Sequence, residues 1–231
     1  MMYWFFVKTL GPIAKLIFYP ESEGVKNIPK NGGAIIASNH LAVIDDAVIP
    51  MTCPRMVHFM GKSDYFTGKS FKGRIKKWFF TSVGVFPVDR SGGKKSAEAM
   101  NNARKVLEEG HLFGIHPEGT RSPDGRLYKG HTGVARLSLE TGCPIIPVAL
   151  IGTGELQPAG KVWPRRGKVK VIYGKPIYVS KIAANKITHE QIRSLTDRMT
   201  EEIRKMSGQT YVDEYAQTVK KRIAGEKQTQ A

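Results

Sequence analysis

The chain of 231 residues is long enough to bury a full hydrophobic core, and we expect one folded domain. Hydrophobic residues make up 41% and charged residues 24%, which argues against a polytopic membrane protein and against a disordered chain. The 36 Lys and Arg residues against 20 Asp and Glu give a net charge of +16. This charge predicts a polyanionic partner such as nucleic acid, anionic lipid, an acidic carrier protein or a phosphorylated substrate, with simple solubility as the alternative.

The first 20 residues are apolar and aromatic, but Lys8, Pro12 and Lys15 interrupt them before they reach the roughly 20 apolar residues of a spanning helix. Aromatic residues open the segment and a Tyr-Pro pair closes it, an order that does not favour a signal peptide. The pattern is typical of a helix or helix pair lying in a membrane interface, with docking on the protein's own core as the alternative. We therefore expect residues 1–20 to form an interfacial anchor and residues 21–231 to form the main domain.

Short apolar runs bounded by Gly, Pro or Asn then alternate with segments of helical period. We expect strands within 32–39, 55–61, 83–88, 111–117, 144–152 and 168–174, and helices within 45–52, 70–81, 94–110 and 130–142. This alternation predicts an α/β fold in which a central mixed or mostly parallel sheet is flanked by helices. The interfacial helical segment would precede that sheet.

Two helices are expected at the end of the chain. The segment from Thr188 to Gln191 has the form of a capping box, and an apolar stripe continues from it to Met206. A second helix is expected from about Val212 to Ala224, because Gly225 is a typical residue at a helix end. The polar tail that follows is expected to be loose.

The first stretch with chemical content is an apolar strand that ends in Asn39 and His40, with Asp45 five positions after the histidine. Five steps of a continuous helix would put His40 and Asp45 on different faces, about 140° apart. The two residues meet more easily if His40 lies in the turn after the strand and Asp45 begins the next helix. Asp45 would then hold one imidazole nitrogen and leave the other free as a base, whereas an unrelated surface histidine and helix-start aspartate are the alternative.

Three further blocks follow in the chain. Residues 114–122 combine a strand end with Pro117, Glu118, Gly119, a hydroxyl group and Arg121, where an open α/β sheet usually binds its ligand. Residues 84–90 and 61–63 each place a cation, Arg90 and Lys62, after a strand end. Residues 143–148 form an apolar strand broken by two prolines.

The blocks around His40, Arg90, Glu118 and the two prolines, in this order, resemble the glycerolipid acyltransferase family, specifically the 1-acylglycerol-3-phosphate (lysophosphatidic acid) acyltransferases. The resemblance extends over residues 25–180. The matching positions, block by block, are Asn39, His40 and Asp45, then Gly84, Phe86 and Arg90, then Glu118 to Ser122, and last Pro144 and Pro147. Two positions depart from the pattern: Ala42 stands where the family often has Ser, and His116 where an aromatic residue often precedes the proline.

The resemblance implies an acyltransferase domain over residues 21–231 and direct transfer of a fatty acyl group from acyl-CoA or acyl-carrier protein. The acceptor would be the free hydroxyl of lysophosphatidic acid, and the product phosphatidic acid for phospholipid synthesis. His40 would be the general base and Asp45 its orienting partner. The implied substrate-binding residues are Arg90, Arg121 and Lys62 for the phosphate, Glu118 for the glycerol or an arginine, and the N–H groups of Gly119 and Thr120 for an oxyanion.

Two alternatives stay open at this point. A sister acyltransferase would act on glycerol-3-phosphate or another lysolipid. A basic module without catalysis would bind nucleic acid or an anionic membrane, but it would account for the net charge and not for the ordered motifs, so we expect no nucleic acid partner. The expected location is peripheral and monotopic, on the anionic cytoplasmic face of the cell membrane.

Other chemistries lack their sequence signals. The chain has no G-x-S-x-G nucleophile elbow and no complete phosphate-binding P-loop. The remaining histidines show no metal-ligand spacing, so neither a metal nor a cofactor is expected. Cys53 and Cys143 lie in apolar contexts and are expected to be small core residues.

Overall fold

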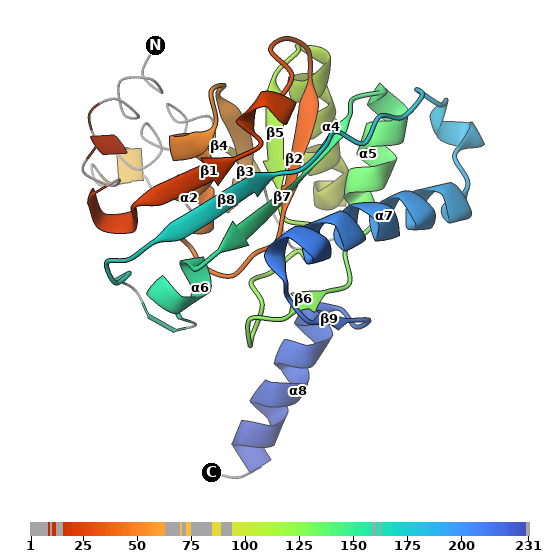
Figure 1. Cartoon of the computed structure of the whole chain (residues 1–231). Helices are drawn as coiled ribbons and strands as arrows, with labels where there is room; N and C mark the ends of the chain where they lie inside the picture. Colours follow the sequence, from red (N-terminus) through yellow and green to blue (C-terminus); the bar gives the residue numbers. More distant parts are fainter. Residues whose placement is uncertain are drawn as a thin grey trace.

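The computed structural model describes residues 9, 11, 12, 16–62, 70, 73, 74, 85–88, 94–158, 160, 161 and 163–229. Its main feature is a seven-stranded sheet of order β1-β8-β7-β2-β5-β3-β4 (Figure 1). The strands are β1 (Pro20–Glu23), β2 (Ala34–Ser38), β3 (Val57–Lys62), β4 (Val85–Val88), β5 (Leu112–Ile115), β7 (Ile145–Ile151) and β8 (Val169–Tyr173). Neighbouring strands are parallel except for the antiparallel pair β7 and β8, so the predicted mostly parallel sheet is confirmed.

Helices cover both faces of this sheet: α2 (Asp45–Thr52) packs on one face, and α4 (Lys94–Glu108), α5 (Gly133–Thr141) and α7 (His189–Ser207) pack on the other. The short α6 (Thr153–Leu156) follows β7, α8 (Ala216–Thr229) extends away from the sheet (Figure 1), and 3₁₀ turns lie at Val25–Asn27 and Ala184–Lys186. One buried cluster joins Ala34 and Ile36 of β2 to α2, and the other joins Ile35 and Ala37 to α4, α5 and α7. Because β2 is buried on both faces, it reads as a continuous apolar run.

The edge at which the parallel strands end is the carboxyl edge of the sheet, and the edge at which they begin is the amino edge. Strands β7, β2 and β5 lie side by side in the sheet, and their last residues are Ile151, Ser38 and Ile115. Their following loops therefore meet at the carboxyl edge, which is where open α/β sheets bind ligands. A small second sheet of β6 (Leu127–Tyr128) and β9 (Tyr211–Val212) lies beside the start of α8 (Figure 1).

The expected boundary at residue 20 coincides with the start of β1. Most of the predicted interfacial anchor and the predicted helix within 70–81 lie outside the described residues. Phe18, counted in the sequence as part of the anchor's apolar surface, is instead buried in the sheet core, whereas Leu16 and Ile17 are exposed. No helix of the described part of the chain is both long and apolar enough to cross a membrane.

The C-terminal region partly contradicts the sequence prediction. The capping box at Thr188 is present, because its hydroxyl accepts from Gln191 N at 3.2 Å and the Gln191 side chain accepts from Thr188 N at 2.9 Å. The last helix, however, begins at Ala216 and not at Val212, which belongs to β9. It also continues through Gly225, because a single glycine costs a helix only about 1 kcal/mol and does not by itself end it.

Candidate active site

His40 and Asp45 lie together at the carboxyl edge, in the turn between β2 and α2. His40 Nδ1 is 2.9 Å from Asp45 Oδ2, and the same oxygen accepts the main-chain N–H groups of Leu41 at 2.7 Å and Ala42 at 2.9 Å. Asp45 is fully buried at the first turn of α2, where the helix dipole favours a carboxylate. The geometry is that of a histidine in the turn and an aspartate at the helix start.

The other imidazole nitrogen of His40 is available for chemistry. Nε2 has no hydrogen-bond partner among the described residues, and the side chain is 16% exposed. Burial, followed by the charge of His116, lowers the pKa of His40 to about 4, against the opposing hydrogen bond to Asp45. His40 is therefore uncharged at neutral pH, and Nε2 carries a lone pair that can accept a proton.

Asn39, the residue before His40, joins the ends of β2 and β7. Its amide oxygen accepts from Leu150 N at 2.7 Å, and its amide nitrogen donates to Leu150 O at 2.9 Å and to Gln209 Oε1 at 2.7 Å. The side chain is fully buried, so each of these bonds replaces a lost contact with water. Asn39 thus holds the backbone that leads into His40.

The block of residues 114–122 contains a tight turn from His116 to Gly119, which is closed by a 3.0 Å hydrogen bond from Gly119 N to His116 O. Pro117 occupies the second position of this turn, and Gly119 has a φ of 70°, a left-handed conformation that favours glycine. A Cβ at this position would lie 3.0 Å from His131 Cδ2. Gly119 and Thr120 were the two expected oxyanion donors. The N–H of Gly119 is used to close the turn, whereas the N–H of Thr120 has no partner among the described residues.

Glu118 points inward from this turn and holds the backbone of His40. Its Oε1 accepts from His40 N at 2.9 Å and its Oε2 accepts from Tyr128 N at 3.0 Å. Burial raises the pKa of Glu118 to about 7, although both main-chain donors favour its ionised form. The expected contact of Glu118 with glycerol or an arginine finds no support in this geometry, because the side chain is buried and both oxygens bind the main chain.

The end of the same block, residues 120–122, binds the main-chain carbonyl of His40 and lies beside two cations. Ser122 N donates to His40 O at 2.7 Å. Arg121 makes no hydrogen bond or ion pair with the described residues, and Lys220 of α8 donates to Thr120 Oγ1 at 2.8 Å. Burial and the neighbouring Arg121 lower the pKa of Lys220. Two neighbouring cations at this point suit an anionic group.

His116 stacks on His40. The two rings are parallel to within 5° and their centroids are 3.9 Å apart. His116 Nε2 is 3.1 Å from Asp46 Oδ1, so the neighbouring acids Asp45 and Asp46 each hold one ring of the pair.

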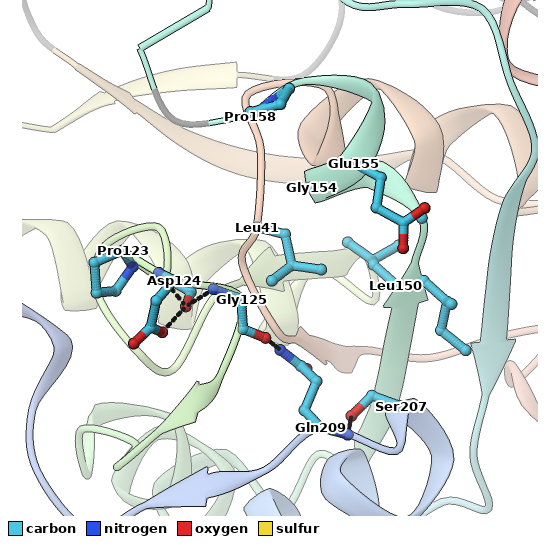
Figure 2. Close-up of a pocket in the computed structure, with 13 residues that line it drawn as sticks. Leu41, Pro123, Asp124, Gly125, Leu150, Gly154, Glu155, Pro158, Ser207 and Gln209 are labelled. Atoms are coloured by element: carbon cyan, nitrogen blue, oxygen red, sulfur yellow. Dashed lines mark hydrogen bonds between the residues drawn. The ribbon is translucent and has the colours of Figure 1, made fainter.

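A pocket of about 440 Å³ adjoins the turn of His40 (Figure 2). Its walls include the apolar side chains of Leu41, Leu150 and Pro158, and its polar groups include the carboxylates of Asp124 and Glu155. Gln209 closes one side, donating to Gly125 O at 2.6 Å. No lysine or arginine lines the pocket within the described part of the chain, so it suits an apolar group better than a phosphate.

The remaining predicted residues are not brought into the site by the described part of the structure. Gly84 and Arg90 lie outside the described residues, and of Phe86 and Lys62 only the strand positions are described. The two prolines of the last block flank the start of β7, and Pro147 lies within it. Cys53 is buried and Cys143 partly buried, as the sequence predicts.

Four residues at this edge were not predicted as site residues: His116, Asp46, Gln209 and Lys220. The acid pair Asp45-Asp46 and the histidine at the end of β5 were visible in the sequence, but nothing in it indicated that they meet. Gln209 and Lys220 lie in the C-terminal region, without a motif around them.

Comparison with known proteins agrees with this site. Residues 20–151 match the sequence model of the Acyltransferase family, and the chain therefore belongs to that family. A 1-acyl-sn-glycerol-3-phosphate acyltransferase of Bacillus subtilis is 28% identical over 207 residues, which cover 89% of this chain and 96% of that protein. A chloroplastic 1-acyl-sn-glycerol-3-phosphate acyltransferase of Arabidopsis thaliana is 31% identical over 182 residues, which cover 77% of this chain and 49% of that protein.

The chain spans about half the length of its chloroplastic relatives from Brassica napus and Arabidopsis thaliana. The crystal structure of the 1-acyl-sn-glycerophosphate (LPA) acyltransferase PlsC from Thermotoga maritima matches with a TM-score of 0.66 at 23% sequence identity. The match covers 87% of this chain and 78% of that one. It shows that the two chains share a fold.

Proposed function

We propose that this chain transfers a fatty acyl group from acyl-CoA or acyl-carrier protein to the free hydroxyl of 1-acyl-glycerol-3-phosphate, making phosphatidic acid. The observation that carries the proposal is the 2.9 Å contact between His40 Nδ1 and Asp45 Oδ2, which leaves Nε2 unbonded among the described residues. An imidazole oriented in this way is suited to take a proton from a hydroxyl group. The names of the relatives support the choice of acceptor.

The proposed reaction needs no covalent intermediate with the protein. His40 Nε2 takes the proton of the acceptor hydroxyl while that oxygen attacks the thioester carbonyl carbon. The carbon–sulfur bond of the tetrahedral intermediate then breaks, and His40 returns the proton to the departing sulfur, giving an ester and a free thiol. Cys53 is an unsuitable nucleophile, because burial raises the pKa of its thiol to about 11.

The phosphate of the acceptor would bind Arg121 and Lys220. Arg121 lacks an anionic partner among the described residues, and Lys220 lies at the same loop through its 2.8 Å bond to Thr120. A guanidinium group binds phosphate oxygens in a bidentate manner, and a lysine adds a point charge. Arg90 and Lys62 stay predictions for the same role.

The acceptor is tested by measuring the free thiol released from an acyl thioester, together with mass spectrometry of the product. Acceptors to compare are lysophosphatidic acid, glycerol-3-phosphate, another lysolipid and an uncharged monoacylglycerol. We expect thiol release and phosphatidic acid only with lysophosphatidic acid. Preference for glycerol-3-phosphate or another lysolipid would indicate a sister activity, and no turnover with any acceptor would contradict the enzymatic proposal.

The phosphate contact is tested with Arg121→Met and Lys220→Met. Each should lower kcat/KM for lysophosphatidic acid by about 10- to 100-fold, because a hydrogen bond to a charged group contributes about 1.5–3 kcal/mol. The loss on monoacylglycerol should be much smaller. Lys221→Met, which removes the exposed lysine next to Lys220, is the matched control and should behave as the wild type. Equal losses on both acceptors would exclude a phosphate contact.

Contact with an anionic membrane belongs to the same proposal, because the substrate is a lipid. The loop 161–168 leads into β8, whose start lies beside the end of β7 at the carboxyl edge. Trp163 in this loop is 85% exposed, and Lys161, Arg165, Arg166 and Lys168 surround it in sequence. An exposed tryptophan among basic residues suits the headgroup region of an anionic membrane. Gly167 N also donates to Ile17 O at 3.0 Å, which ties this loop to the N-terminal segment.

Vesicle co-sedimentation tests the membrane contact. We expect the full chain to bind anionic vesicles more strongly than neutral ones, and Trp163→Ala to reduce binding to both. Removal of residues 1–15, which keeps the buried Phe18 and β1, tests the anchor predicted from sequence. Tyr178→Ala is the matched control, because Tyr178 is 75% exposed at the amino edge. Unchanged sedimentation of both Trp163→Ala and the truncated chain would contradict this part of the proposal.

A further inference from the structure

The stacked pair of His40 and His116 contains two imidazole rings in different environments. His40 donates from Nδ1 to Asp45 and has no partner for Nε2 among the described residues. His116 has partners on both nitrogens, in the loop after β2 and at the start of α2. The parallel rings, 3.9 Å apart, therefore place an open imidazole against a fully bonded one.

The partners of His116 define its charge. Nδ1 lies 3.2 Å from Ser38 O, 3.1 Å from Asn39 O and 3.0 Å from Ser38 Oγ. Nε2 lies 3.1 Å from Asp46 Oδ1, a carboxylate whose side chain is 54% exposed. Carbonyl and carboxylate oxygens only accept, so the oxygens of Ser38, Asn39 and Asp46 favour a proton on both ring nitrogens, and the Ser38 hydroxyl can accept from Nδ1 as well. An imidazole that donates from both nitrogens is an imidazolium cation.

We propose that His116 is a positioning residue for the base: its cationic ring, held by Asp46 and stacked on His40, keeps His40 uncharged and ready to accept a proton. This inference rests on the proposed role of His40 and adds a residue to it. The same positive charge makes a proton taken up by His40 more acidic. That proton is then returned more readily to the departing thiolate in the proposed reaction.

The charges that face the pair come from two elements. Asp45 and Asp46 face it from the first turn of α2, and Glu118 faces it from the turn after β5. No lysine or arginine contacts either ring within the described part of the chain. Burial lowers the pKa of His116, but the hydrogen bond and charge of Asp46 outweigh it and raise that pKa to about 8, in agreement with the geometry.

The inference is tested by titrating the imidazole rings in the full-length protein by NMR, without substrate. The ring signals of His40 and His116 are assigned by their loss in single substitutions. In the wild type we expect His116 to titrate near pH 8 and His40 near pH 4. In His116→Phe, which keeps a flat ring and removes the charge, the midpoint of His40 should rise by about 1 to 3 pH units.

The control and a second variant complete the test. His111→Phe changes the other histidine pair, His58 and His111, whose rings are 5.1 Å apart at the amino edge, and should leave His40 unchanged. Asp46→Asn keeps the stacked ring and should lower the midpoint of His116. If His116→Phe does not fold, the wild-type titration with Asp46→Asn still decides, because a His116 that is neutral at pH 7 overturns the inference.

The activity readout separates this inference from the proposed function. The acid limb of kcat/KM should move upward in His116→Phe by the same amount as the NMR midpoint of His40, whereas a purely structural role would lower the rate without moving the limb. An unchanged His40 midpoint in folded His116→Phe overturns the inference. Absence of turnover in the wild type would contradict the proposed function and leave the NMR result standing.

Discussion

The amino edge of the sheet, where β2, β3 and β5 begin, differs from the carboxyl edge in how its charged side chains are bonded. At the amino edge the guanidinium group of Arg55 donates to three carbonyl oxygens, those of Pro29 at 2.7 Å, Gly32 at 2.9 Å and Gly110 at 2.7 Å. Each of these carbonyls belongs to a loop that precedes a strand. Arg55 therefore uses its donors to hold the loops together.

At the carboxyl edge, hydrogen-bonding capacity is left over. His40 Nε2, the buried Oδ1 of Asp45 and the guanidinium group of Arg121 have no partner among the described residues. A pocket adjoins the neighbouring residues Leu41 and Ser122, and the residues that hold the main chain around His40, Asn39 and Glu118, are fully bonded. Buried polar groups are normally satisfied, so the exceptions at this edge agree with the proposed active site. The comparison separates an edge whose polar groups stabilise the fold from the edge at which we propose the chemistry.

The largest effect expected from this comparison is on turnover. His40→Ala should lower thioester turnover by at least about 100-fold, because a general base contributes about 10²–10⁴-fold. The fold should stay intact, since the ring is partly exposed and its partners are the side chains of Asp45 and His116. Activity above about a tenth of the wild type, with an unchanged circular dichroism spectrum, would show that His40 is not the base. His111→Ala at the amino edge should keep full activity.

The second largest effect is expected at the amino edge, and it concerns stability but not activity. Arg55→Ala should lower the free energy of unfolding by about 3 kcal/mol, because it removes charge-assisted bonds to three loop carbonyls. Urea unfolding measures this loss, and kcat/KM of the folded variant should equal that of the wild type. A specific fall in kcat/KM without loss of stability would mean that the two edges are not separable in this way.

Glu118→Gln is expected to combine both kinds of effect. The amide retains one acceptor, so either His40 N or Tyr128 N faces an NH₂ group and loses its bond. An unsatisfied buried donor costs about 1–3 kcal/mol, and we expect a loss of about 2 kcal/mol in unfolding experiments. Turnover should fall because the backbone of His40 shifts. Wild-type turnover in a destabilised Glu118→Gln protein would assign Glu118 to stability only.

The smallest effect concerns how stability depends on pH, and it again distinguishes a histidine of the carboxyl edge from one of the amino edge. The folded pKa of His116 is raised to about 8 from the ordinary value of 6.5, so its contribution to stability is present below pH 6.5 and lost as pH rises through about 8. The size is at most about 2 kcal/mol, from 1.36 kcal/mol per pKa unit. Between pH 6 and pH 9 the wild type should therefore lose about that much more stability than His116→Phe. His111→Phe should follow the wild type, and identical curves for all three proteins would contradict the raised pKa.

Much of the secondary structure was predictable because it depends on local sequence patterns. Apolar runs predicted β2, β3, β4, β5, β7 and β8 but not β1 or β6, and the capping box at Thr188 predicted the start of α7, since these patterns depend on neighbouring residues only. The pairing of His40 with Asp45 was also local, because a turn followed by a helix start brings residues five apart together. Gly225 misled the prediction of the last helix, because a glycine permits a helix end without requiring one.

Local sequence patterns specify the α/β alternation, the turn that brings His40 to Asp45, and the acyltransferase motifs that place the chain in its family. The partners of those motifs follow from the three-dimensional arrangement: Glu118 holds the backbone of His40, His116 stacks on its ring, and Lys220 reaches Thr120 from α8. The physical reason is separation along the chain. His40 and His116 meet because β2 and β5 are neighbours in parallel register, from Ala34 opposite Leu112 to Ala37 opposite Ile115, and strand order is set by packing of the whole sheet and not by any local period.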